Sequence, residues 1–164
     1  MLEGQAPIFE SQTFNVLSNS LAAIDDPTDQ VAIVAALKSI AWGCSDQDLY
    51  EWTRLGHQFE YARHRVDVED FPEGTGARRV AKALAGISEF HDRRQERSTP
   101  YLVEQLIRSR RLREVAALME TSGSGERLMD MFIEMSRTLQ RSGTGSLREL
   151  VRWLSGQAKA NVRA

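Results

Sequence analysis

The chain has one cysteine, four prolines and no long apolar run, and these shortages exclude several classes of protein. Cys44 has no second cysteine for an internal disulfide, and no nearby histidine motif makes it a metal ligand or a nucleophile. The longest apolar runs, such as VAIVAAL at 31–37, are too short to cross a bilayer. The amino terminus lacks the basic and then apolar pattern of a secretory signal. We therefore expect a cytoplasmic protein that makes no use of a membrane.

Sequence motifs for phosphate and metal chemistry are also missing. Lys38 is the one lysine followed by a hydroxyl residue, but leucine precedes it, so no Gly-rich phosphate loop is formed. His57 and His64 lie near the acidic residues of segment 67–70, without the i, i+4 spacing of a helical metal site. We expect ordinary surface residues there, and no cofactor bound by this chain.

The composition is that of one soluble globular domain, with 27% charged and 41% hydrophobic residues among 164. The net charge is only −2, but it is unevenly distributed: residues 1–75 are acidic and residues 76–113 are basic. Most of the basic residues are arginines, which suit forked contacts with phosphate or carboxylate. The basic middle third is therefore compatible with nucleic acid, and equally with pairing to the acidic first half.

Apolar residues recur at spacings of three and four along most of the chain, which predicts helices. Ser11 is the expected cap of the first helix, and Asp26, followed by Pro27, is that of the second. Ser45 and Asp48 come close to a capping box for a third, shorter helix. The first helix has the expected buried stripe Phe14, Leu17, Leu21 and Ile24. The second has Ile33, Val34, Leu37, Ile40 and Ala41.

The second half of the chain continues the helical pattern after an irregular excursion at residues 56–76. A long helix is expected from Gly76 to about Glu96, and another from Thr99 that is bent or broken near Ser109. A helix follows the TSGSG loop at 121–125, and a capping box of Ser146 and Glu149 predicts the last. The predicted fold is all-α, an irregular domain of about six to eight helices with a short extended segment at the amino terminus.

Two arginine groups are the main candidates for binding. They lie at two helix ends and are Arg93, Arg94 and Arg97, and then Arg108, Arg110, Arg111 and Arg113. If those ends are neighbours, the groups form a patch that contacts DNA phosphates without reading sequence. The alternative is a solvated face paired with acidic neighbours. Met129, Met131 and Met135 likewise fit either an adaptable binding groove or ordinary core packing.

Three stretches together resemble the accessory 2B subdomain of UvrD/Rep-type superfamily 1 DNA helicases, especially the branch near the AddA and RecB helicase-nucleases. They are EGQAPIFESQTFNVLSNSLAAIDDPTDQVAIVAALKS (3–39), GCSDQDLYEW (43–52) and ERLMDMFIEMSRTLQRSGTGSLRELVRWL (126–154). They follow one another in the order expected for that subdomain. The turn that many relatives press against duplex DNA is reduced here to Trp42, Gly43 and Cys44.

The resemblance implies a piece of a larger enzyme that acts in DNA repair or recombination. Residues 1–10 would be an orphaned extended segment of the neighbouring motor domain, and residues 11–164 the helical 2B-like domain. The implied partners are duplex or junction DNA, bound weakly in isolation, and the motor domains of the parent helicase. ATP and magnesium would be bound by those motor domains, not by this chain. The candidate DNA contacts are Lys38, Gly43, Ser45, Arg93, Arg94, Arg97, Arg110 and Arg111.

Two other functions stay open on the sequence. A helical protein-interaction module without DNA binding could use the methionine-rich helix or the acidic first half. A small enzyme of unknown type is a third hypothesis, although the chain carries no ATPase or nuclease motif.

Overall fold

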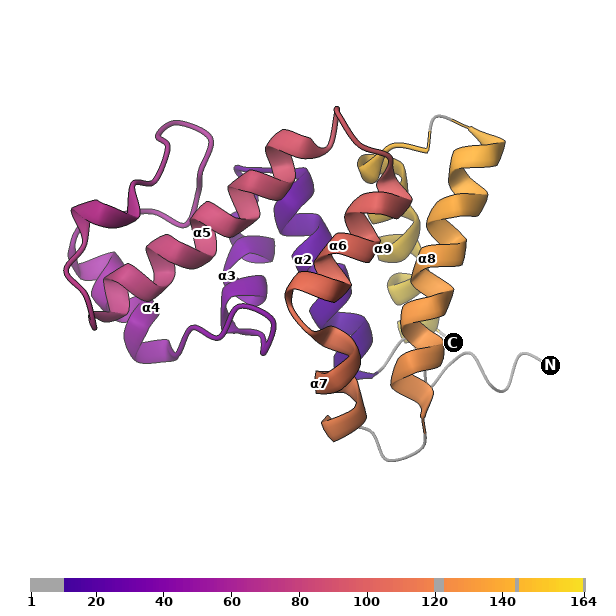
Figure 1. The fold of residues 1–164 in the computed structure, drawn as a ribbon, viewed down its shortest axis with the longest axis horizontal. Helices are drawn as coiled ribbons and strands as arrows, with labels where there is room; N and C mark the ends of the chain where they lie inside the picture. The colour runs from indigo at the N-terminus through magenta and orange to yellow at the C-terminus, as the bar shows by residue number, and fades with distance from the viewer. Residues whose placement is uncertain (1–10, 120–122, 144, 164) are drawn as a thin grey trace.

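The computed structural model describes residues 11–119, 123–143 and 145–163, and these residues form eight α-helices and one 3₁₀ turn without a strand (Figure 1). The helices are α2 (Gln12–Asp25), α3 (Gln30–Lys38), α4 (Asp46–Arg54), α5 (Gly76–Arg93), α6 (Thr99–Ser109), α7 (Leu112–Met119), α8 (Ser124–Ser142) and α9 (Leu147–Arg163), with the turn η1 at Val68–Asp70. The predicted all-α class is confirmed. The segment 1–10, expected to be extended, lies outside the described residues.

Helix α2 occupies the centre of the molecule. It packs against α3 and α5 on one side and against α8 and α9 on the other, so that it separates two lobes (Figure 1). The predicted cap is confirmed, because the Ser11 hydroxyl accepts a hydrogen bond of 3.1 Å from the backbone N–H of Phe14. The predicted stripe is confirmed too, since all four side chains are at most 2% exposed: Phe14, Leu17, Leu21 and Ile24.

The start of α3 corrects the sequence prediction. Asp29, not Asp26, caps this helix by accepting a hydrogen bond from the N–H of Ala32 at 3.1 Å. The Asp26 carboxylate instead accepts from the N–H of Thr28 at 2.9 Å, in the turn that follows α2. The reason is that α2 runs on to Asp25, so that Asp26 is occupied in ending one helix and cannot begin the next.

The end of α3 corrects a second prediction. Ile40 was expected in the buried stripe, but its side chain is 56% exposed. The helix ends at Lys38, and Ser39 leaves the helical conformation, so the spacing that predicted an inward direction no longer applies. Ile33, Leu37 and Ala41 are buried as predicted.

The chain after α5 follows the expected plan. The predicted break near Ser109 separates α6 from α7, and Arg111 in that break has a positive φ of 52°. The Ser146 hydroxyl accepts from the N–H of Glu149 at 3.2 Å, which is one of the two hydrogen bonds of the predicted capping box. Of the helices in the described ranges, none has both the length and the hydropathy to span a membrane.

We predict that Leu17→Ala lowers the free energy of unfolding by about 2–5 kcal/mol, because it leaves a cavity where α2 meets the core. Leu17 has no exposed surface. The control is Val31→Ala, whose side chain is 83% exposed and whose removal should cost less than about 0.5 kcal/mol. Urea denaturation of both variants measures the difference, and equal losses would contradict a central role for α2.

Candidate nucleic-acid interface

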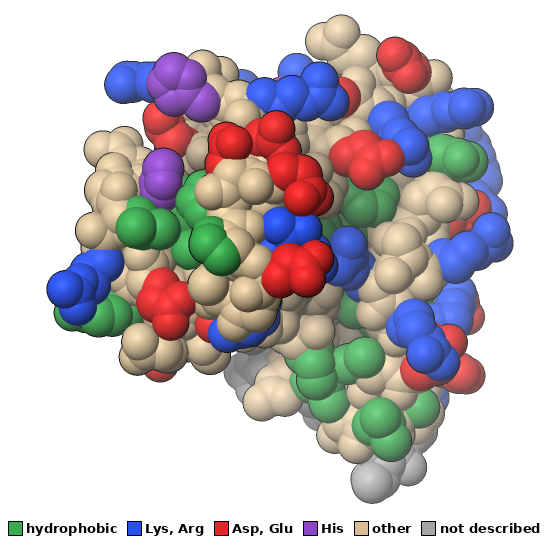
Figure 2. Space-filling model, turned by 60° about the vertical axis from the view of Figure 1, so that its left-hand side comes forward, with side chains coloured by type: hydrophobic (Ala, Val, Ile, Leu, Met, Phe, Trp, Pro, Cys, Tyr) green, Lys and Arg blue, Asp and Glu red, His purple; other side chains and the backbone are tan. Residues whose placement is uncertain are grey.

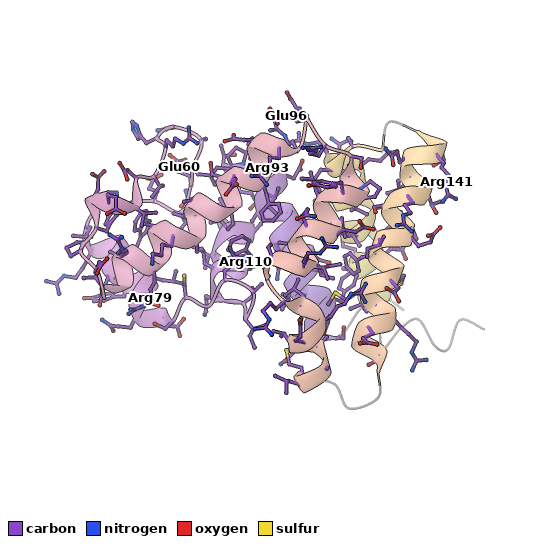
Figure 3. All side chains as sticks on the ribbon, viewed as in Figure 1. Glu60, Arg79, Arg93, Glu96, Arg110 and Arg141 are labelled. Carbon is purple, nitrogen blue, oxygen red and sulfur yellow. The ribbon has the colours of Figure 1, made fainter. Side chains whose placement is uncertain are left out.

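The two arginine groups lie at opposite ends of α6. Arg93 and Arg94 end α5 and Arg97 follows them, just before the start of α6, whereas Arg110 and Arg111 lie just after its last residue. An eleven-residue helix is about 16 Å long at about 1.5 Å per residue. Figure 3 labels Arg93 at the end of α5 and Arg110 lower down, level with the middle of that helix. The groups therefore do not merge into one patch.

The group beside the start of α6 is largely used within the chain. The Arg93 guanidinium pairs with Glu89 at 2.6 Å, one turn earlier on α5. Arg94 donates a hydrogen bond of 2.7 Å to the backbone carbonyl of His91 and so satisfies an acceptor at the end of α5. Arg97 lies over an aromatic ring on α6, 5.2 Å from its centroid. The Arg93 pair matches the alternative of a solvated face paired with acidic neighbours, whereas Arg94 and Arg97 contact a backbone carbonyl and a ring.

The other group meets the turn between α3 and α4. The N–H of Gly43 donates to the Ser39 carbonyl and that of Cys44 to the Leu37 carbonyl, both at 2.8 Å. Gly43 has a positive φ of 70°, a conformation that favours glycine. The turn presents Trp42 inward, where only 7% of its surface is exposed. Short backbone bonds and a buried ring thus hold the predicted contact segment in one conformation.

Arg110 stacks on Trp42, with its guanidinium carbon 4.1 Å from the ring centroid. Burial lowers the pKa of Arg110, and its Nε has no hydrogen-bond partner among the described residues. This guanidinium also forms no ion pair within the described part of the chain, because no carboxylate there lies within pairing distance of it. Stacking over an indole face favours a cation and fixes the direction of its planar fork. Among the described residues, Arg110 is therefore an oriented cation without an anionic partner.

Gly86 of α5 completes this contact. A Cβ at this position would lie 2.8 Å from a ring carbon of Trp42 and 3.3 Å from Nη2 of Arg110. Only glycine allows the helix, the ring and the guanidinium to approach so closely. The prediction from sequence missed this contact, although a glycine inside the longest expected helix was a signal, because glycine disfavours a helix interior by about 1 kcal/mol.

The remaining predicted contacts surround the same turn. Lys38 pairs with Asp46 at 2.9 Å, and Arg111 lies 3.7 Å from Glu114. All four side chains are about half exposed or more, and such surface pairs contribute only about 0–1 kcal/mol. Phosphate groups can therefore replace these carboxylates at little cost. We call the set Lys38, Gly43, Ser45, Arg110 and Arg111 the turn surface.

Ser45 is engaged in the predicted capping box, which is confirmed. Its hydroxyl accepts from the N–H of Asp48 at 3.1 Å, and its own N–H donates to the Asp48 carboxylate at 2.9 Å. The other oxygen of Asp48 accepts two hydrogen bonds from Arg79, at 2.8 and 3.1 Å. This places a carboxylate at the start of α4. The hydroxyl and N–H of Ser45 thus already serve the fold.

The other sequence candidates lie elsewhere. Met129 is 1% exposed, and Met131 and Met135 pack against the core, so these side chains serve packing. In the residues that the structure describes, no group of histidine, cysteine and acidic side chains could hold a metal ion. Figure 2 shows acidic and basic side chains interspersed over the lobe that contains α4 and α5. No large single-sign surface forms on that face.

Comparisons with protein families, with curated proteins and with solved structures give no match to this chain. The resemblance to a helicase subdomain therefore stays a prediction from the sequence.

We predict that Gly86→Ala destabilises the protein by about 1–3 kcal/mol, since its methyl group must displace Trp42. Gly156→Ala on α9 is the matched control, because a Cβ there meets nothing within 4 Å. That substitution should stabilise the helix by up to about 1 kcal/mol. Thermal unfolding measures the change in stability of both variants, and tryptophan fluorescence reports the displacement of Trp42. A stabilising Gly86→Ala with unchanged fluorescence would show that the stack is not tight.

Acid should destabilise the Ser45–Asp48–Arg79 cluster. The hydrogen bonds from Arg79, and then those from Ser45, hold the pKa of Asp48 below the ordinary value of an aspartate. A lowered pKa contributes stability above the unfolded value, and this contribution is lost as pH falls through the folded pKa.

The comparison is Asp48→Asn, which should be less stable than wild type near neutral pH and should converge with it once the pH falls below the lowered pKa of Asp48. Asp46→Asn, in the same first turn but 83% exposed, should show neither effect. Thermal unfolding across a pH series measures all three proteins. A constant gap between wild type and Asp48→Asn at every pH would rule out the linkage.

Proposed function

We propose that this chain is a non-catalytic helical domain that contacts DNA through the turn surface, in the manner of the 2B subdomain of a UvrD/Rep-type helicase. The observation that supports it most is Arg110, an oriented guanidinium that has no anionic partner in the described part of the chain and lies at the turn that the sequence resemblance marks for duplex contact. Arg110 and the turn come from distant parts of the chain, so their meeting is independent of the quoted sequence motifs.

The contact would be made with the phosphate backbone. Arg110 offers a preformed fork to a phosphate, and such charge-assisted bonds are about twice as strong as neutral ones. Lys38 and Arg111 exchange their exposed carboxylate partners for neighbouring phosphates. A Cβ at Gly43 would point into open space, so the backbone of the turn is accessible to a close approach. Contacts of this kind position a duplex without reading its sequence.

The resemblance assigns the chemistry of such an enzyme to other domains. On this proposal, residues 11–164 guide a duplex or junction in DNA repair or recombination in the cytoplasm, and residues 1–10 belong to the adjoining motor domain. The motor domains hydrolyse ATP with magnesium and are the protein partners. The contribution of this chain is the fixed geometry of its phosphate contacts.

Fluorescence anisotropy with a labelled duplex that carries a single-stranded tail tests the proposal across a salt series. The logarithm of the binding constant should fall linearly with the logarithm of the salt concentration. Each neutralised phosphate should add about 0.9 to the magnitude of that slope. The double variant Lys38→Ala/Arg111→Ala should reduce the slope by about 2 and weaken binding at least tenfold, if each side chain meets one phosphate. Both residues are exposed, so the fold is retained.

The matched control is Arg137→Ala/Arg141→Ala on α8, which removes the same charge elsewhere; Arg141 lies well away from Arg110 in Figure 3. A triple variant of Arg93, Arg94 and Arg97 tests the second arginine group separately. Equal losses in the α8 control and the turn-surface variant would mean that only net charge matters. Absence of binding at low salt would refute DNA contact.

The interaction module is the second candidate. It is favoured by two large apolar side chains that face solvent, Leu118 of α7 at 88% exposure and Ile40 of the turn at 56%. Exposed apolar residues near the centre of a patch are common anchors of protein interfaces. Loss of self-association or motor-domain binding in Leu118→Ser, with DNA binding absent in wild type, would favour this candidate.

A further inference from the structure

A cavity lies in the lobe of α4 and α5, away from the turn surface. Residues 55–75 connect α4 to α5 and enclose a volume of about 410 Å³ above Trp52. This volume is at the small end of the range of about 300–1,000 Å³ for ligand pockets. Figure 3 shows Glu60, which lines the cavity, on the opposite side of the lobe from Arg79. A cavity of this volume admits a small molecule or one unit of a polymer.

The loop that forms the cavity is held in shape by hydrogen bonds. The Tyr61 hydroxyl donates to backbone carbonyls at the end of α2, including that of Ile24 at 3.0 Å. The Trp52 indole N–H donates to the Gln58 carbonyl at 3.0 Å. Arg78 of α5 donates to two further loop carbonyls. Connections longer than about 15 residues are uncommon without a function. The hydrogen bonds of segment 55–75 hold it in one conformation as a wall of the cavity.

One wall of the cavity is aromatic. The His57 ring lies on the Trp52 ring with centroids 4.6 Å apart and planes inclined by 32°. Phe71 supports the same cluster, 5.1 Å from Trp52. Trp52 and Phe71 are buried, whereas His57 is exposed. The cluster therefore offers one accessible ring face, on which a planar group can stack.

The rim carries both charge signs. Arg63 lies 3.8 Å from Glu60, at the long limit of an ion pair, and its side chain is 79% exposed. Arg65 and Asp70 also line the cavity, and within the described residues neither side chain has a hydrogen bond or ion pair. The cavity thus combines two guanidiniums for an anion with carboxylates that accept hydrogen bonds from an amine.

We propose that this cavity binds a single nucleotide unit whose base stacks on His57. The phosphate lies between Arg63 and Arg65, and the Asp70 and Glu60 carboxylates accept hydrogen bonds from the amino group of the base. Stacking of a base on an aromatic ring stabilises binding for every base, because each base has a π-face. A base with an exocyclic amino group is preferred over thymine, which lacks one. The proposal does not depend on the turn surface, because the two sites share no residue.

Calorimetric titration of the full chain with GMP, AMP and TMP tests the assignment. We expect saturable binding, with GMP or AMP at least threefold tighter than TMP. His57→Ala and Arg65→Glu should each weaken binding at least tenfold. The control is Arg54→Glu, which changes an exposed arginine of α4 outside the cavity. The nucleotide affinity of this variant should stay within twofold of that of wild type. Circular dichroism verifies that each variant is folded.

A single-stranded tetranucleotide of the preferred base distinguishes the two sources of this ligand. Binding at least tenfold tighter than that of the mononucleotide assigns the cavity to a single strand, and equal binding assigns it to a free nucleotide. Either result supports a nucleotide site. Absence of saturable binding of all probes at millimolar concentration overturns it, and so does equal weakening by Arg54→Glu and Arg65→Glu. The turn-surface variants should bind GMP normally.

Discussion

Burial of α2 is the interaction on which the rest of the structure depends. The helices of one lobe, α3 and α5, and those of the other, α8 and α9, all pack on this single amphipathic helix. Apart from α2, the helices of the two lobes make little direct contact with one another. The lobes hold their relative position because both bury apolar surface against α2, and such burial is the dominant favourable term in folding.

The candidate interface depends on α2 through one polar contact. The hydroxyl of Ser20, which has no exposed surface, accepts the indole N–H of Trp42 at 3.1 Å. This bond satisfies a buried donor and fixes the plane of the ring. The ring plane in turn sets the direction of Arg110, which comes from the other lobe. A change inside α2 can therefore alter a surface cation without touching it.

Local patterns predicted the structure well where the physics is local. Caps at Ser11 and Ser45 depend on hydrogen bonds within three residues, and both were correct. The choice of Asp29 over Asp26 depends on how far α2 extends, which spacing alone does not decide. The pairing of Arg110 with Trp42 spans two lobes and leaves no periodic signal. The separation of the arginine groups, in contrast, follows from the expected helix between them and its rise per residue.

Internal charge pairing explains only part of the basic middle third. Arg79 meets the acidic first half at Asp48, and Arg78 meets it at Glu69. Arg113 instead pairs with Asp130 of α8. Arg110 has no ion-pair partner in the described chain, although burial partly desolvates it. It stacks on the ring of Trp42, which can come so close to α5 only because residue 86 is glycine. Burying a charge without an anion is costly. The cost would be offset when an external anion reaches the guanidinium, and a phosphate matches its fork.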